Sequence, residues 1–279
     1  MDSARRFFVA GLLVVVVAIA ATGKVFAEHP HGRTIEPILQ DLFLGESVYP
    51  QERGEWQVTT GFLWAEKREH DFEIPTLIEY GITDRLQFGV EVPTTFLRNG
   101  PDDYEGVGNI ELDTYYNFWN DPCSRTAYGM GFTIGLPEAT PHVGKDAVLY
   151  EPYFVAYGEN DLFATNVYTA IEIEDPLDEH EDTTVGAQFD VACFTEIGSF
   201  VPLFELGVEL EENGETPVRL APGIYWKPEA WPETEFGVSL PIGLNEEAAD
   251  LGVFVLLTWE FGTESSARRT RHGMLEGLK

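Results

Sequence analysis

The chain has 279 residues, of which 17 are basic and 48 are acidic, so its formal net charge is −31. This charge excludes nucleic acid as a partner, because phosphate recognition requires a basic face. Aromatic residues make up 13% of the sequence, which argues against disorder, since disordered chains are poor in aromatics. We therefore expect a folded chain whose carboxylates either line an interior or coat an outer surface, as in a halophilic soluble protein.

Residues 1–27 have the pattern of a secretory signal peptide. Arg5 and Arg6 precede an apolar run from Phe7 to Ala20, and Val25 and Ala27 place small residues before a cleavage site after Ala27. An uncleaved anchor helix is the alternative, because the run approaches the lower length limit for spanning a bilayer. No later segment offers a run of apolar residues long enough for a membrane helix, so only a closed β-barrel could place the mature protein in a membrane.

Residues 28–54 are expected to form a separate segment on the periplasmic side, before the barrel. Residues 34–45 place apolar side chains near helical spacing and end in Gly45, which favours a short helix or a loop. His29 and His31 could bind a metal ion, but a flexible terminus is the simpler interpretation. We predict no metal site and no cofactor.

From Glu55 to Phe261 the sequence divides into segments of about the 9–11 residues that a tilted membrane strand needs. We expect strands near 55–66, 72–82, 85–97, 105–119, 125–136, 148–158, 162–174, 183–195, 199–211, 216–227, 233–244 and 250–261. Tight connections such as residues 81–85 and 158–161 alternate with longer or more acidic ones such as residues 175–182. This alternation is typical of an outer-membrane barrel, whereas a soluble β-sandwich, the alternative fold, predicts none.

The last of these segments shows the two-residue period of a strand most clearly. One side is wholly apolar and consists of Leu251, Val253, Val255, Leu257, Trp259 and Phe261. This pattern resembles the closing strand of outer-membrane barrels, although here a tail of residues 262–279 follows it. We expect the tail to be disordered, with contact between its basic residues 265–272 and anionic groups or the periplasmic rim as the alternative. The predicted fold is an all-β, transmembrane, antiparallel up-and-down barrel of about twelve strands over residues 55–261.

The same period assigns polar side chains to the lumen of this barrel. The candidate lumen-lining residues are Arg85, Glu91, Glu111, Asp113, Glu172, Asp190, Glu205, Glu209, Arg219, Glu235 and Glu260. A charge on the lipid face is destabilising by a few kcal/mol near the bilayer midplane, so these acids must face water or one another. We expect a wet, anionic lumen that favours cations, with solvated acids at the rims as the alternative.

Three stretches resemble a known family. They are residues 78–93 (IEYGITDRLQFGVEVP), residues 106–112 (GVGNIEL) and, near the end, residues 222–226 (PGIYW) followed by residues 236–243 (FGVSLPIG). Together they resemble the putative MetA-pathway of phenol degradation family, a group of outer-membrane-barrel-like transporters, over residues 55–261. The resemblance implies an outer-membrane barrel that passes small molecules, with aromatic ones among the options, and it carries no catalytic residues.

We predict that the protein is not an enzyme. His29, His31 and His272 fall outside the barrel and His70, His142 and His180 fall in predicted loops, so no predicted strand carries a histidine for nucleophilic catalysis. No Gly-x-Ser-x-Gly sequence is present. Cys123 and Cys193 lack metal-site spacing, and two free thiols are a simpler expectation than a disulfide. His180 and its acidic neighbours could bind a divalent cation, but a flexible acidic loop is favoured.

The predicted function is an outer-membrane channel or passive transporter for small molecules or cations. Its expected partners are outer-membrane lipid, the passing solutes and the barrel assembly machinery that inserts such proteins. The alternative is a structural or surface-interaction barrel that is plugged by inward side chains such as Tyr115, Tyr168 and Phe254.

Overall fold

A computed structural model describes residues 37–66, 70–99, 102–137, 140, 143–178, 180–212 and 214–262. The predicted signal peptide and all of the predicted tail except Gly262 lie outside the described residues. The strands are β1 (Trp56–Glu66), β2 (His70–Ile74), β3 (Thr76–Thr83), β4 (Leu86–Glu91), β5 (Thr94–Asn99), β6 (Asp102–Val107), β7 (Glu111–Asp121), β8 (Thr126–Gly135), β9 (Ala147–Glu159), β10 (Ala164–Pro176), β11 (Thr184–Phe194), β12 (Phe200–Leu210), β13 (Val218–Trp226), β14 (Thr234–Ser239), β15 (Ile242–Gly243) and β16 (Gly252–Phe261). Within the described ranges no helix is long and apolar enough to cross a membrane.

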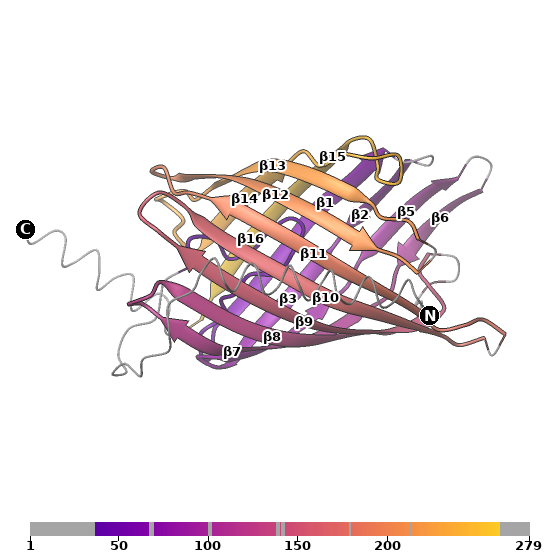
Figure 1. Ribbon diagram of the computed structural model, residues 1–279, viewed down its shortest axis with the longest axis horizontal. Helices are drawn as coiled ribbons and strands as arrows, with labels where there is room; N and C mark the ends of the chain where they lie inside the picture. The colour runs from indigo at the N-terminus through magenta and orange to yellow at the C-terminus, as the bar shows by residue number, and fades with distance from the viewer. Residues whose placement is uncertain are drawn as a thin grey trace, which may run out of the picture.

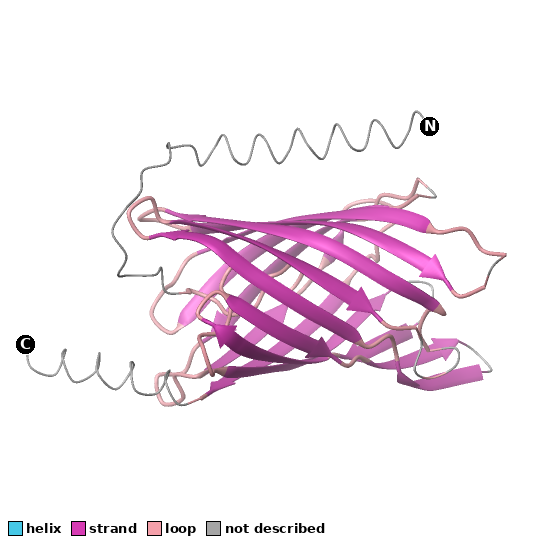
Figure 2. Ribbon diagram, turned by 90° about the horizontal axis from the view of Figure 1, so that it is seen from below, coloured by secondary structure: helices cyan, strands magenta, loops and turns pink. Residues whose placement is uncertain are grey.

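Twelve of these strands close into one antiparallel barrel (Figures 1 and 2). Their order around the barrel is β1, β3, β4, β7, β8, β9, β10, β11, β12, β13, β14 and β16. β16 returns to pair with β1, with Phe261 opposite Trp56 and Gly252 opposite Ala65. The barrel confirms the predicted fold, and the first and last predicted strands form its seam.

Three of the four remaining strands lengthen barrel strands beyond a proline, and the fourth, β6, pairs with β5 and precedes β7. β2 extends β3 across Pro75, β5 extends β4 across Pro93, and β15 extends β14 across Pro241. A proline has no backbone N–H and therefore interrupts a ladder of hydrogen bonds. The twelve segments expected from the sequence thus match the barrel. Three of them are divided at proline, and a fourth, residues 105–119, is divided between β6 and β7.

The two ends of the barrel differ in their connections. At the short-turn end, β3 meets β4, β7 meets β8 and β9 meets β10 through turns such as residues 84–85 and 122–125. At the opposite, long-loop end lie longer connections, such as residues 136–146 and 244–251. This is the alternation predicted from the sequence.

The two faces of the wall have opposite character, as the two-residue period predicts. Met130, Phe204 and Trp259 point outward and are 51%, 61% and 54% exposed. Glu205, between Phe204 and Leu206, points inward and is only 1% exposed. The outer face is therefore an apolar belt, and the inner face carries the polar side chains.

Tyrosine rings cover glycines on one side of the inner wall. A Cβ atom added to Gly129 would lie 1.8 Å from the Tyr115 hydroxyl, and one added to Gly131 would lie 2.1 Å from the Tyr153 ring. The rings of Tyr115 and Tyr153 stack with centroids 6.1 Å apart. Glycine is required at both positions because any side chain would displace a ring.

Candidate functional site

Ten of the eleven predicted lumen residues lie on barrel strands and alternate with outward apolar residues. They are Glu91 on β4, Glu111 and Asp113 on β7, Glu172 on β10, Asp190 on β11, Glu205 and Glu209 on β12, Arg219 on β13, Glu235 on β14 and Glu260 on β16. Asp190, Glu205, Glu235 and Glu260 are buried, and the others are half-buried.

Arg85 is placed differently from the prediction. The strand expected to begin at residue 85 begins at Leu86, and Arg85 lies exposed in the preceding turn, where its backbone N–H donates to Thr83 Oγ1 at 3.2 Å. Gln87 is the first inward residue of β4 and is 5% exposed. An error of one residue at a strand end is enough to move a side chain from the wall to the rim.

Inward carboxylates that were not predicted include Glu79 on β3 and Glu151 on β9. Glu79 accepts hydrogen bonds from the side-chain amides of Gln57 and Gln87. Glu151 accepts one from the Tyr168 hydroxyl. Each could have been identified from the sequence. Glu79 follows the outward Ile78 and Glu151 follows the outward Tyr150, so the two-residue period places both acids on the inner face.

Four inward carboxylates form a continuous group that we call the acidic band: Glu91, Glu111, Asp113 and Glu151. Glu91 pairs directly with Glu111 across β4 and β7. Asp113 pairs with Thr133 across β7 and β8, and Thr133 pairs with Glu151 across β8 and β9. Asp113 also accepts hydrogen bonds from the Tyr153 hydroxyl at 2.8 Å and from Thr133 at 3.1 Å.

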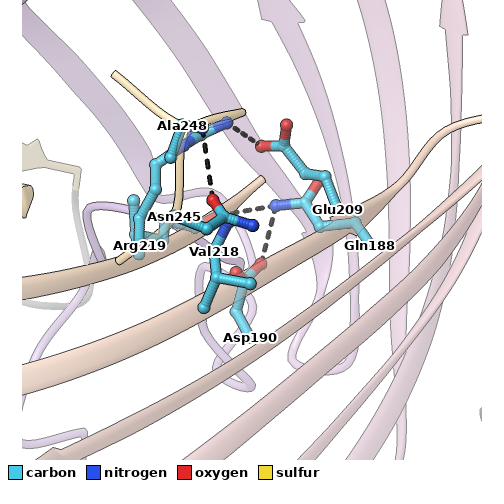
Figure 3. Close-up of polar contacts among 8 residues, drawn as sticks. Gln188, Asp190, Glu209, Val218, Arg219, Asn245 and Ala248 are labelled. Atoms are coloured by element: carbon cyan, nitrogen blue, oxygen red, sulfur yellow. Dashed lines mark hydrogen bonds and ion pairs between the residues drawn. The ribbon is translucent and has the colours of Figure 1, made fainter. Parts of the chain in front are cut away.

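Inward cations are few among the described residues, and those near the lumen are paired. On the opposite side of the wall, Arg219 forms an ion pair with Glu209 of the neighbouring strand (Figure 3). Figure 3 also shows Gln188 donating to Asp190 at 2.6 Å, and Asn245 accepting from the backbone N–H of Val218 at 3.2 Å. The loop that carries Asn245 therefore folds against the long-loop end of this wall.

Residues 37–54, which we call the inner segment, lie inside the barrel. The sequence predicts a separate short helix or loop before the barrel. The inner segment has no helix and no strand. Its indigo trace overlaps the strands of the barrel in Figure 1, and hydrogen bonds to the inward side chains of Glu205 and Asn166 place it inside. Side chains of the wall satisfy many of its backbone groups, which is why it adopts an irregular path rather than the helix that its local spacing favours.

The first part of the inner segment is held at the short-turn end. The Lys227 ammonium donates to the Ile38 carbonyl at 2.7 Å and forms an ion pair with Glu235 at 3.3 Å. Glu235 also accepts from the backbone N–H of Gln40 at 3.2 Å. This wall acid therefore balances one cation and binds the segment.

The Asp41 carboxylate is hydrogen-bonded to several wall side chains. Its Oδ2 atom accepts from Thr59, from Thr258 at 2.7 Å and from Gln57 at 3.2 Å. These donors lie on β1 and β16, so Asp41 binds at the seam of the barrel.

Glu205 and Phe43 hold the middle of the inner segment. The Glu205 carboxylate accepts from the backbone N–H groups of Phe43 at 3.0 Å and Leu44 at 2.9 Å. The Phe43 ring stacks on Tyr225 with centroids 4.8 Å apart. It also lies over two wall glycines, because Cβ atoms added to Gly223 and Gly237 would approach the ring to 3.0 and 2.8 Å.

Residues 44–48 follow the wall across β11, β10 and β7. The carbonyls of Leu44, Glu46 and Val48 accept from Gln188 at 2.9 Å, Asn166 at 2.9 Å and Tyr115 at 2.8 Å, respectively. A Cβ atom added to Gly45 would lie 2.9 Å from that of Tyr168. Glycine at position 45 therefore lets the backbone lie directly against the wall.

The inner segment returns to the short-turn end through Gln51. The Gln51 backbone N–H donates to Gln87 at 2.8 Å, and its side chain donates to Gln57 at 2.7 Å. The Gly54 N–H then bonds the Gly81 carbonyl at 2.8 Å. Both ends of the inner segment therefore leave the barrel at the same rim.

Glu46 is exposed although the barrel surrounds it. Its backbone is fixed by Asn166, so the carboxylate projects into a part of the lumen that water reaches. Enclosure within the barrel, and then the nearby carboxylates of Asp113 and Glu79, raise the pKa of Glu46 well above its ordinary value. Burial also raises the pKa of Asp41, although the hydrogen bonds from Thr59 and Thr258 oppose the shift.

The described residues that were considered for metal binding or catalysis do not form a cluster. No group of three or more His, Cys, Asp or Glu side chains among the described residues could hold a metal ion. His180 is exposed in its loop, and Cys123 and Cys193 are free and exposed. His70 begins β2 rather than lying in a loop as predicted. His29, His31 and His272 lie outside the described residues.

The barrel is similar to outer-membrane porins of known structure. No protein-family model matches the sequence and no curated protein shows significant similarity to it. A KdgM porin matches with a TM-score of 0.50 and 10% identity over 74% of this chain and 99% of the porin. A NanC porin matches with a TM-score of 0.50 and 9% identity over 75% of this chain and 99% of the porin. At this identity the likeness shows a shared porin-like barrel fold.

Proposed function

We propose that the protein is an outer-membrane channel for small molecules, with an acidic lumen that favours cations. The observation that carries the proposal is that the two faces of the barrel wall have opposite polarity. The outer face presents side chains such as Phe204 and Trp259 to the surroundings, as a lipid-facing belt requires. The inner face presents carboxylates, which is the arrangement of a polar conduit rather than of an apolar core.

The charge of the inner wall supports cation preference. The acidic band places four carboxylates on β4, β7 and β9. Among the described strand residues, the inward positive charge is that of Arg219 on β13, which is paired with Glu209. Rings of acidic side chains attract cations and repel anions in channels. Tyr153 and Tyr168 border the same region, and tyrosine faces bind organic cations and aromatic solutes.

The test is the current through the mature protein in a planar bilayer that separates two concentrations of KCl. A reversal potential of the sign that K⁺ permeation gives would support the proposal. A potential of the opposite sign would contradict the acidic-lumen part and leave a channel. A folded, inserted protein that passes no current, with or without residues 37–50, would contradict the channel itself.

A second candidate function is a closed barrel that displays its loops without transport. The hydrogen bonds between the inner segment and the wall favour this candidate, because they place chain across the lumen. Deletion of residues 37–50 separates the two candidates. A channel would gain conductance when the segment is removed, whereas a structural barrel closed by its wall side chains would still pass no current.

A further inference from the structure

We propose that the inner segment is a displaceable plug, which is docked against the wall in the closed channel and leaves its seat when the channel conducts. The proposal rests on the proposed channel function and adds a gate to it. Four properties of the described residues support it: the course of the segment, the shape of its seat, the kind of contacts it makes and the position of its ends.

The course of the inner segment places it across the lumen. At residues 38–40 it contacts Lys227, directly after β13, and β14. It then contacts the seam of β1 and β16 at Asp41, and β12 at residues 43–44. It then contacts β11, β10, β7 and β4 through residues 44–51. A segment that touches strands on all sides of the barrel obstructs passage, so conduction requires it to shift.

The wall is shaped to receive this segment. Cβ atoms added to Gly81, Gly207 and Gly237 would lie 1.9 Å from the Glu52 carbonyl, 3.1 Å from the Leu44 side chain and 2.8 Å from the Phe43 ring. Three glycines on separate strands therefore make room for three parts of the segment. The docked position is a specific seat rather than a chance collapse.

The polar contacts are of a kind that can be remade in water. The segment adds no strand to the sheet, and its carboxylate, amide and hydroxyl anchors can be hydrated after release. Release also exposes the apolar side chains of Leu39, Phe43 and Val48, which pack against the wall and favour the docked state. The fit is also incomplete. The Tyr225 hydroxyl and Gln51 Oε1 are buried at the interface without a hydrogen bond, and such atoms gain partners when the seat fills with water.

The position of the ends permits movement. Lys227 holds residue 38 and Gly81 holds residue 54, both at the short-turn end. The segment can therefore withdraw toward that end as a loop, with β1 and the seam of the barrel unchanged.

The experiment locks the segment in its seat. In a background of Cys123→Ser and Cys193→Ala, the pair Asp41→Cys and Thr59→Cys replaces two side chains that are hydrogen-bonded to each other, so oxidation can join the two cysteines in the docked state. We expect oxidation to lower the bilayer current at least tenfold and a reductant to restore it. The two single-cysteine variants are the controls, and their current should respond to neither reagent.

A second measurement detects the movement without current. The Val48 side chain is 1% exposed, whereas the Glu46 side chain is open to the lumen. A charged, membrane-impermeant thiol reagent should modify both Val48→Cys and Glu46→Cys. Formation of the lock should slow only the modification of Val48→Cys, at least tenfold.

The outcomes separate the gate from the channel. Equal currents with and without the lock would overturn the gate and leave the channel intact. Modification of Glu46→Cys but not of Val48→Cys would also overturn it. If no variant conducts, including the one that lacks residues 37–50, the channel function fails, and the Val48→Cys modification still decides whether the segment moves.

Discussion

The carboxylate of Glu205, on β12, binds the backbone N–H of Leu44, in the inner segment, at 2.9 Å. The same carboxylate binds the preceding N–H, of Phe43, at 3.0 Å. One wall side chain thus satisfies two consecutive backbone donors that no strand or helix pairs. This pair of bonds fixes the middle of the segment and suggests the first prediction.

Glu205→Gln should loosen the inner segment. The amide keeps one acceptor oxygen and presents an NH₂ group to the second donor. Hydrogen bonds to a charged group contribute about 1.5–3 kcal/mol each, so loss of one should speed Val48→Cys modification by about tenfold or more. Glu196→Gln, in an exposed turn, is the matched control. An unchanged modification rate would show that Glu205 does not hold the segment.

Tyr225→Phe should stabilise the docked segment. The ring of Tyr225 stacks on Phe43, but its buried hydroxyl has no hydrogen bond. Removing an unpaired buried hydroxyl removes a desolvation penalty of about 1–3 kcal/mol while the stack remains. Thermal unfolding followed by circular dichroism should show a higher midpoint. Tyr153→Phe should lower the midpoint, because the Tyr153 hydroxyl donates to Asp113; a fall in both variants would refute the argument.

Gly237→Ala should displace Phe43. The new Cβ atom would lie 2.5 Å from the Tyr225 ring and 2.8 Å from the Phe43 ring, so one ring must move. Overpacking of this kind costs about 1–3 kcal/mol and should raise both Val48→Cys modification and basal current. Gly89→Ala is the control, because its nearest neighbours lie at 3.5 Å. Equal behaviour of the two variants would argue against a tight seat at Gly237.

The inner segment should dock more tightly in acid. The pKa of Asp41 is raised in the docked state, so the docked segment binds a proton that the released segment gives up at the ordinary carboxyl pKa. This proton stabilises the docked state fully at pH values below the ordinary carboxyl pKa, and the stabilisation is lost as pH rises through the raised pKa of docked Asp41. Modification of Val48→Cys, relative to Glu46→Cys, should therefore be faster at pH 8 than at pH 5. Asp41→Asn should reduce this difference, and a steeper dependence in that variant would contradict the assignment.

The acidic band should set ion preference. Glu91 and Glu111 lie directly opposite each other, and replacing both with glutamine should move the reversal potential toward zero in a KCl gradient. Arg219→Gln should move it the other way, because Glu209 loses its partner. Glu229→Gln changes an acid outside the wall strands and serves as the control. If all three variants give the same potential, the band does not select ions.

The barrel could be predicted from the sequence because its signal is local. Met130 and Phe132 alternate with Gly129 and Gly131 along one strand, and the same two-residue period recurs in each predicted strand. Inward acids such as Glu205 follow directly from that period. Arg85 was misplaced because the period does not define where a strand starts.

The inner segment could not be predicted in the same way. Ile38, Leu39 and Leu42 have helical spacing, but the partners that decide their conformation are distant in the chain, and Glu205 is 162 residues from Phe43. The glycines of the seat were the available signal. Gly207, Gly223 and Gly237 occupy inward positions on neighbouring strands, and a cluster of missing side chains in one region of a wall indicates that something else fills the space.

The common rim of Lys227 and Gly81 also bears on biogenesis. A barrel that closes by joining its first and last strands encloses any chain inside it, and a strand threaded from end to end would have to be in place before the seam formed. The inner segment instead enters and leaves through one opening. It can therefore fold into its seat after the cylinder is complete, and no order of synthesis or insertion is imposed on it.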